Sequence, residues 1–263
     1  SLTICNAEYL SLIPSKLSVH IKVETGLFRQ GVSLFDLSNF LDRIPKTAYI
    51  EGVYSHLADA ENMNDRNFTL QQIAQFKQAV EIVKTAGHGQ LITHLAATDG
   101  ILMYPEAEFD MVRAGIITYG VPPSRDFVSK FTLLGLQPAL IWKTRITQLK
   151  SVPKSATVGY GRSEKVRRAS MIATLPVGYW DGYPRSLSGR GIVIVRGVRC
   201  KVLGRVFMNM LIVNVTDVPG VSVGEEVTLL GPDNSALELA EFAGTISYEI
   251  TTRINPWIPR NYV

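Results

Sequence analysis

The pattern of secondary structure changes near the middle of the chain, and this change constrains the fold more than any other feature. In residues 1–135, segments typical of strands alternate with segments typical of helices. The strand-like segments are residues 19–23, 49–57, 91–95 and 111–119. Repeated strand–helix–strand order is typical of parallel βαβ units, so this half is predicted to be α/β.

Two helices between these strands have recognisable ends. Ser33 opens the first, in which apolar residues follow at spacings of three and four as far as Ile44. Thr69 and Gln72 have the spacing of a capping box for the second, and Gly87 is placed to end it.

After Pro138 short β-rich runs follow one another, with Gly and Pro turn signals between several of them. One helix interrupts them, with Ser235 and Glu238 as a capping box and Gly244 as its stop. The chain is therefore predicted to have an α/β domain at 1–135 and a mostly β domain at 136–263.

The first domain has too few strands for a closed barrel. Its about four parallel-type strands fall short of the eight that close a (β/α)₈ barrel. The half is then either a small open sheet or the C-terminal part of a longer barrel. The chain begins with Ser1 rather than Met, and this favours the second interpretation.

Composition excludes several classes of protein. Hydrophobic residues make up 46% and charged residues 19%, so the chain can bury a core. The net charge is +4 without a run of five like charges, and no apolar stretch approaches the ~18–20 residues of a membrane span. We therefore expect neither a nucleic-acid partner nor a membrane partner. Cys5 and Cys200 form no disulfide framework or zinc motif, which favours a reducing, cytoplasmic setting.

Polar residues follow successive strands of the α/β half at positions where packing does not require them. They are Arg29, His56, His94, Thr98 and Arg113. Catalytic groups of parallel sheets and barrels come from the carboxyl ends of strands, so these residues predict a site there. A lone His or Arg is more often structural, and an ion pair of Arg113 with a nearby aspartate is the alternative for that residue.

Metal and phosphate-loop sites are not expected. The metal-type ligands His56, Asp59, Glu61, His94 and Asp99 show no His-x-His or His-Glu-x-x-His spacing. The glycine fingerprints of P-loop and Rossmann proteins are also absent from the sequence.

Several motifs, in order over nearly the whole chain, resemble those of the alanine racemase family. They are VHIKVETG (19–26), GVYSHLA (52–58), MVRAGI (111–116), VGYG (158–161), GYWDGYPR (178–185), GRVFMN (204–209), SVGEEV (222–227), YE (248–249) and RINP (253–256). The resemblance implies a fold-type III pyridoxal 5'-phosphate enzyme. It also implies an N-terminal (β/α)₈ barrel, a β domain, and a head-to-tail homodimer with a shared active site.

The resemblance assigns the cofactor contacts. Arg113 would face the pyridine nitrogen of pyridoxal 5'-phosphate. Thr98, Gly115 and Ile116 match the positions that hold its phosphate, and Tyr248 would add its hydroxyl.

The remaining assignments concern acid–base chemistry and substrate. Tyr160 matches one of two catalytic bases and would reach the partner subunit's cofactor, with His56 linking it to the pyridine-facing arginine. That arginine and a cationic His56 would favour a tyrosinate. Arg29 and the backbone of Met208 would contact the substrate carboxylate, and Lys22 matches a lysine that is carbamylated in many members.

Some positions depart from the family. The cofactor lysine lies in a Lys-Ala-x-Ala-Tyr-Gly motif that this sequence lacks. We therefore expect a chain truncated at its N-terminus relative to the family and inactive by itself. Asn209 replaces the usual Asp, Phe207 a small residue, and Thr98 a Ser.

The resulting functional prediction is an alanine racemase that interconverts L- and D-alanine through a Schiff base with a Lys/Tyr pair of bases. D-alanine would serve cell-wall peptidoglycan synthesis. A racemase for serine or for a broader set of amino acids and a non-catalytic fragment remain alternatives. A cofactor-carrier protein with a related barrel is disfavoured by the β half.

Overall fold

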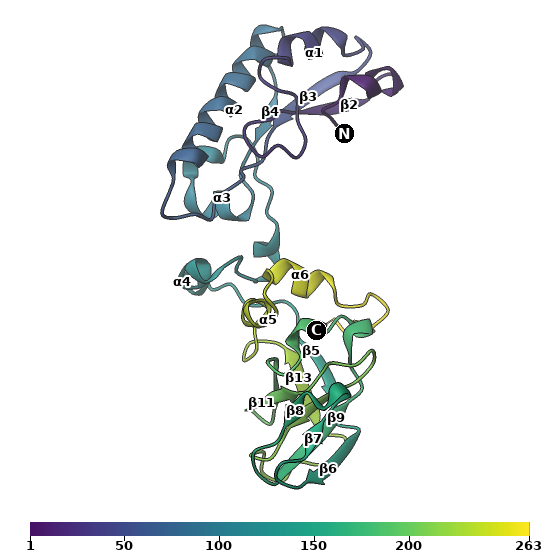
Figure 1. Cartoon of the computed structure of the whole chain (residues 1–263). Coiled ribbons are helices and arrows are strands. Elements are labelled where there is room, and N and C mark those ends of the chain that lie inside the picture. The colour runs from purple at the N-terminus through teal and green to yellow at the C-terminus, as the bar shows by residue number, and fades with distance from the viewer. Residues whose placement is uncertain (263) are drawn as a thin grey trace. The chain divides into compact units, whose positions relative to one another are not determined.

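The computed structural model describes residues 1–262 (Figure 1). They pack as two compact units, one of residues Ser1–Gly115 and one that begins at Ile116. Each unit has its own hydrophobic core. No helix within residues 1–262 is both long enough and apolar enough to cross a membrane.

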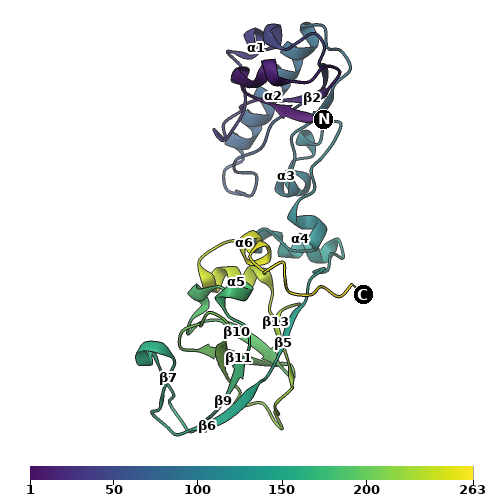
Figure 2. The ribbon, with the colours of Figure 1, turned by 90° about the vertical axis from the view of Figure 1, so that its right-hand side faces the viewer.

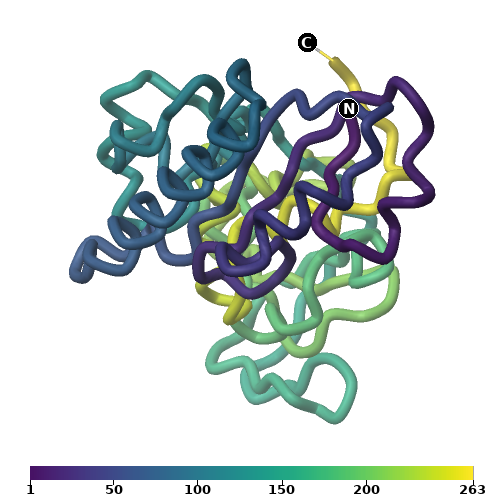
Figure 3. The backbone as a smooth tube through the Cα atoms, turned by 90° about the horizontal axis from the view of Figure 1, so that it is seen from above, coloured from purple at the N-terminus to yellow at the C-terminus, as the bar shows by residue number. Residues whose placement is uncertain are grey.

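The first unit is a parallel sheet covered by helices. Its four strands follow sequence order and are β1 (Leu2–Ile4), β2 (Ser18–Lys22), β3 (Tyr49–Tyr54) and β4 (Ile92–His94). Its helices are α1 (Leu37–Arg43), α2 (Asn67–Thr85) and α3 (Thr98–Met103). Apolar residues of β2 and β3 pack against α1 and α2 in the core, and Figures 2 and 3 show helical coils beside the extended strands.

Both predicted helices exist, but their starts differ from the predicted ones. The first begins at Leu37, because Ser33 and Asp36 form a turn in which the Ser33 hydroxyl accepts the N–H of Asp36. The second begins at Asn67, and Thr69 and Gln72 form no capping box. Both are buried, and their side chains bond to the loop after β3. Tertiary partners therefore replaced the predicted cap.

The predicted strand at 111–119 does not form. Met111 makes a single bridge to His94, and Ile116–Tyr119 is a 3₁₀ turn. Ile116 and Val121 are buried in the core of the second unit. The two packing units therefore divide between Gly115 and Ile116.

The second unit is built on a seven-stranded antiparallel sheet in the order β5-β13-β10-β11-β12-β9-β6. These strands are β5 (Trp142–Arg145), β6 (Gln148–Val152), β9 (Ser170–Leu175), β10 (Ile192–Val195), β11 (Val198–Leu203), β12 (Leu211–Asn214) and β13 (Glu226–Leu230). β7 (Thr157–Val158) and β8 (Glu164–Lys165) form a separate two-stranded antiparallel sheet.

Three helices accompany this sheet: α4 (Val128–Leu133), α5 (Ala236–Ala243) and α6 (Ser247–Thr252). The helix predicted from Ser235 and Gly244 is α5. The Ser235 hydroxyl accepts the N–H of Glu238, and Gly244 ends the helix with φ of 72°. The predicted start and stop of this helix are confirmed.

Candidate active site

The carboxyl ends of β2, β3 and β4 carry a row of polar side chains. Register places Lys22 beside Tyr54, and Tyr54 beside His94. The Tyr54 ring stacks on the His94 ring with centroids 4.7 Å apart and planes at 10°. Lys22 Nζ lies 5.7 Å from the centroid of Tyr54. Sequence reasoning singled out Lys22 and His94 but missed Tyr54, whose signal was its position next to Ser55 and His56.

Arg113 joins this row and is held by five hydrogen bonds. Nη1 donates to His94 Nδ1 at 2.5 Å and to the His94 carbonyl at 3.2 Å. Nη2 donates to the carbonyls of Ser55 at 2.7 Å and Leu95 at 2.9 Å, and to His56 Nδ1 at 3.2 Å. Within residues 1–262 the Nε–H has no acceptor, so this N–H is the donor that a ligand can use.

The ion-pair alternative for Arg113 is not supported. Asp110 accepts the backbone N–H of Thr93 at 2.9 Å and its hydroxyl at 2.5 Å. These bonds hold the pKa of Asp110 below its usual value. Among the described residues Arg113 pairs with no carboxylate; its Cζ lies 5.2 Å from the Tyr54 ring centroid. The guanidinium is thus bound by neutral acceptors.

His56 and His94 are neutral in this arrangement. Burial and the charge of Arg113 lower the pKa of each to about 4. A guanidinium only donates, so the Nδ1 of each ring must accept and the proton must lie on Nε2. The expectation of a cationic His56 is therefore wrong, because burial and the charge of Arg113 favour the neutral ring.

Gln72 holds the segment that carries His56. This side chain of α2 is 1% exposed. Its Oε1 accepts the N–H of Ala58 at 2.9 Å, and its Nε2 donates to the His56 carbonyl at 3.4 Å. The Gln72 amide thus holds the loop after β3 through two hydrogen bonds.

Lys22 is buried while Arg29 is exposed. Lys22 is 5% exposed, and its Nζ donates to Gln30 Oε1 at 3.4 Å. Burial, followed by the charge of Arg29, lowers the pKa of Lys22. The lowered pKa enlarges the fraction of neutral amine at this position.

Two of the four residues predicted to hold a phosphate lie together in the first unit. Thr98 is the first residue of α3, and its Oγ1 accepts the N–H of Gly115 at 3.2 Å. A Cβ at Gly115 would lie 3.3 Å from this oxygen, a tight contact that would require a shift of a few tenths of an ångström. Ile116 lies in the core of the second unit, and Tyr248 lies there on α6 with 36% exposure.

The second unit presents Tyr160 and Met208 at one cavity of about 620 Å³. Arg185, Arg205 and Asn209 also line it. Tyr160 is 69% exposed and lies in a 3₁₀ turn (Tyr160–Arg162). It stands between Gly159 and Gly161, which take φ of 78° and 68° and allow the turn that pushes the phenol outward.

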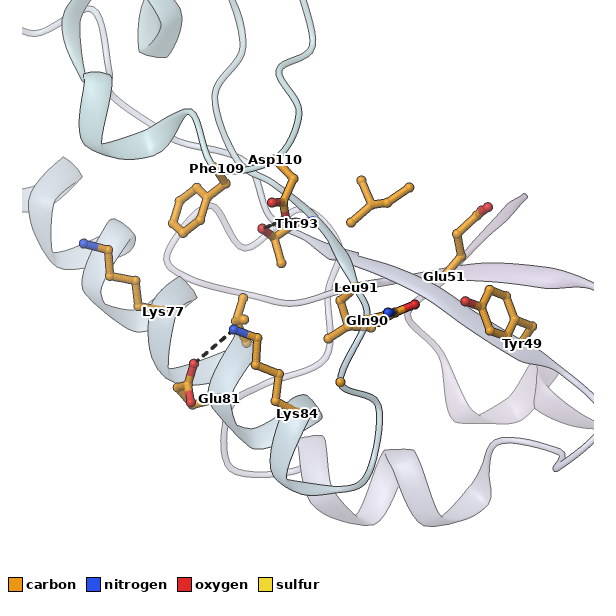
Figure 4. A pocket seen from close by; sticks show the side chains of 13 residues that line it. Tyr49, Glu51, Lys77, Glu81, Lys84, Gln90, Leu91, Thr93, Phe109 and Asp110 are labelled. Atoms are coloured by element: carbon orange, nitrogen blue, oxygen red, sulfur yellow. Dashed lines mark hydrogen bonds and ion pairs between the residues drawn. The ribbon is translucent and has the colours of Figure 1, made fainter.

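A larger cavity, of about 810 Å³, lies at the opposite ends of the strands (Figure 4). Tyr49, Leu91 and Ile92 line it near the starts of β3 and β4, and Lys77, Glu81 and Lys84 of α2 form another wall. Glu81 and Lys84 pair with each other. Because the perturbed groups cluster at the carboxyl ends, we place the candidate site there and not in this cavity. No group of three or more metal-type ligands occurs in the described part of the chain.

The first unit is α/β and carries its polar groups at the carboxyl ends of the strands, and an antiparallel β domain follows it. This is the arrangement of a class of two-domain enzymes. Residues 4–123 match the family description "Alanine racemase, N-terminal domain", and residues 139–262 match "Alanine racemase, C-terminal domain". The chain belongs to the alanine racemase family.

Named relatives agree with this assignment. Alanine racemase of Carboxydothermus hydrogenoformans is 39% identical over all of this chain and 72% of its own length. That of Halothermothrix orenii is 41% identical over 93% of this chain and 65% of its own length. This chain thus spans about two thirds of the length of these relatives.

A solved structure shows the same fold. Alanine racemase from D-cycloserine-producing Streptomyces lavendulae superimposes with a TM-score of 0.90 at 29% identity, over 99% of this chain and 72% of that one. The predicted fold class, part of a (β/α)₈ barrel followed by a mostly β domain, is confirmed.

Proposed function

We propose that these residues belong to an alanine racemase that uses pyridoxal 5'-phosphate to interconvert L- and D-alanine. The observation that carries the proposal is Arg113, fixed by neutral acceptors with its Nε–H left for a ligand. A ring nitrogen with a lone pair fits this donor, and the adjacent Thr98 hydroxyl and Gly115 N–H are groups of the kind that bind a phosphate.

When bound, pyridoxal 5'-phosphate supplies an electron sink for the carbanion left by removal of the α-proton. Arg113 donates to the ring nitrogen and keeps its own proton, because a guanidinium does not deprotonate in proteins. Thr98 and Gly115, with Ile116 and Tyr248, are the proposed phosphate contacts. Arg29 and the Met208 backbone are proposed to bind the substrate carboxylate.

Tyr160 is proposed as one of the two acid–base groups. Racemisation needs a proton removed on one face and returned on the other, hence two such groups. In this proposal neutral His56, protonated on Nε2, donates a hydrogen bond that stabilises the phenolate. The exposed Tyr160 and Met208 at one cavity support a head-to-tail homodimer in which this face meets a partner's cofactor.

Lys22 is proposed as a carbamylated lysine that orients Arg29. A neutral amine combines with CO₂ and releases one proton to form the carbamate, and the lowered pKa of buried Lys22 favours the neutral amine. Cys5 and Cys200 are both unpaired, which supports a cytoplasmic setting, where D-alanine would enter peptidoglycan synthesis.

This sequence lacks the family's cofactor-lysine motif. We therefore propose that a polypeptide of these 263 residues does not racemise alanine by itself. Measurable D-alanine production by that polypeptide would contradict this and would require another lysine in the site.

The cofactor proposal is tested by titrating the chain with pyridoxal 5'-phosphate and following absorbance and binding. Arg113→Lys should weaken binding because lysine lacks the planar fork, whereas Arg43→Lys at the exposed end of α1 should not. Equal binding by both variants would refute the assigned role of Arg113.

A further inference from the structure

A chain of hydrogen bonds leads from Arg113 across the sheet to a carboxylate. His20 on β2 lies between His94 and Glu51. His20 Nδ1 is 2.9 Å from His94 Nε2, and His20 Nε2 is 3.3 Å from Glu51 Oε2. With the 2.5 Å contact from Arg113 Nη1 to His94 Nδ1, four side chains form one continuous series.

Only one arrangement of protons satisfies every link of this series. Arg113 can only donate, so His94 Nδ1 accepts and His94 carries its proton on Nε2. That N–H donates to His20 Nδ1, which leaves the His20 proton on Nε2, where it donates to Glu51. A second proton on either ring would set two N–H groups against each other. The lowered pKa of His94, caused by burial and Arg113, agrees with a neutral ring.

A glycine in β3 leaves room for this series of hydrogen bonds to cross the sheet. β3 lies between β2 and β4, and the residue of β3 that pairs with His20 is Gly52. A Cβ at Gly52 would lie 2.5 Å from His20 Cε1 and 2.6 Å from His20 Nδ1. Glycine inside a strand often marks such a close approach. Any other residue at position 52 would push the imidazole out of line with His94.

Glu51 supplies the negative end. It accepts hydrogen bonds from His20 and from the Ser1 hydroxyl, and these bonds keep the pKa of its carboxyl below the usual value. Its side chain is 31% exposed and lines the cavity of Figure 4, away from the row at the carboxyl ends. The site is thus connected to a charge that lies outside it.

We propose that His20 and Glu51 are positioning residues for Arg113, acting through His94. The carboxylate at the far end favours the direction in which every link donates away from the arginine. The opposite direction would place an N–H of His94 against Nη1 and would remove the hydrogen bond between the guanidinium and the His94 ring. A role of Arg113 in cofactor binding rests on the proposed function. The positions of the protons on His20 and His94 are independent of it.

The proton arrangement is measured by nitrogen-15 NMR of the histidine rings in the full 263-residue chain at pH 7. Its four histidines are assigned by single His→Gln variants. We expect His20 and His94 to show a pyridine-type Nδ1 and a pyrrole-type Nε2. His94 protonated on Nδ1, or on both nitrogens, would overturn the proposal.

Glu51→Gln tests the coupling, with Glu81→Gln as the control. The amide keeps the shape and an acceptor but loses the charge, and its NH₂ group can also donate in the opposite direction. We expect the ring nitrogens of both His20 and His94 to shift in Glu51→Gln and neither to shift in Glu81→Gln, which removes a surface charge paired with Lys84. A change confined to His20 would show that the series does not reach the arginine and would overturn the proposal.

A second measurement separates this inference from the proposed function. Glu51→Gln should weaken pyridoxal 5'-phosphate binding severalfold, without loss of the folded state by circular dichroism. If the unmodified chain binds no cofactor, the proposed function fails while the tautomers still decide the positioning role. If the cofactor binds equally to both forms, the positioning role is refuted and the proposed function stands.

Discussion

The phenol ring of Tyr160 packs edge-on against the phenyl ring of Phe207, with centroids 4.9 Å apart and planes at 68°. Tyr160 is otherwise largely exposed, so this contact restricts the direction of its hydroxyl. Phe207 is also the position where this sequence departs from the small residue of the family pattern. The proposed catalytic hydroxyl of Tyr160 therefore depends on this contact for its direction.

Phe207→Ser should loosen Tyr160 and lower kcat more than it raises KM for alanine, in a protein that contains these residues and the cofactor-lysine segment. Edge-to-face contacts contribute about 0.5–1.5 kcal/mol, so the loss in kcat should be up to about tenfold. Phe35→Ser, at a ring that is 92% exposed, is the control. Equal kinetic constants for Phe207→Ser and the parent would show that the contact is incidental.

Tyr160→Phe removes only the hydroxyl. If that oxygen carries a proton, one direction of racemisation should fall by ~10²–10⁴-fold while cofactor affinity stays the same. Steady-state assays from each enantiomer, with a cofactor titration alongside, measure both quantities. A fall below tenfold, or a loss of stability instead, would favour a purely structural tyrosine.

Arg113→Glu exchanges a fixed cation for a carboxyl group at the position proposed to face the ring nitrogen of pyridoxal 5'-phosphate. The nitrogen should then be protonated, which strengthens the electron sink, slows racemisation and raises side transamination. The absorption spectrum of the bound cofactor during turnover and the yield of pyruvate report these changes. An unchanged spectrum with only a lower Tm would contradict the assignment.

The two neutral histidines make stability depend on pH. His56 and His94 have a pKa of about 4 when folded and an ordinary value of 6.5. Because the unfolded chain binds these protons first, stability is complete above pH 6.5 and falls as pH drops toward 4. After allowance for solvent screening, each ring contributes on the order of 1–2 kcal/mol to this fall.

Urea unfolding of the native chain and His56→Gln between pH 4 and 8 measures the effect. The variant should lose part of the dependence, and His88→Gln, in the loop after α2, should keep all of it. Parallel curves for native chain and His56→Gln would show that His56 is not held neutral by the fold.

The carboxyl group of Asp99 gives stability the opposite dependence on pH. Burial, followed by the charge of Glu61, raises its pKa from 3.8 to about 6, and its Oδ1 is buried without a hydrogen-bond partner. The folded state therefore disfavours the ionised form, and this cost appears as pH rises from 3.8 through 6. Asp99→Asn should raise the unfolding free energy by about 1 kcal/mol at pH 8 and not at pH 3.5. A gain of the same size at both pH values would assign the effect to packing.

The sequence predicted the elements whose patterns are local. The strands around Val19 and Val53 alternate or run apolar between turn signals, and α5 has a true cap in Ser235. The prediction of a strand at 111–119 was wrong, because an apolar run alone does not distinguish a strand from a segment that bends and packs into a second core. The capping box predicted from Thr69 and Gln72 was wrong for a related reason. The spacing of the two residues does not show that their side chains bond to the loop after β3.

The candidate site was predicted in part. Arg113, His56 and His94 were visible as polar residues after strands, and the resemblance assigned roles to two of them. Tyr54, His20, Glu51 and Gly52 were not found, because their relevance depends on which residues the strand register sets side by side. Register between strands separated by long helices leaves no trace in local spacing.

The arginine bonds to backbone carbonyls have a consequence for how variation at position 113 is interpreted. Ser55 and Leu95 directly follow β3 and β4, and Arg113 satisfies both of their carbonyls together with that of His94. One side chain thus closes the ends of two strands, as a capping residue closes the end of a helix. The proposed recognition of the cofactor and the closure of the sheet therefore depend on different N–H groups of one side chain, so a substitution at position 113 affects both.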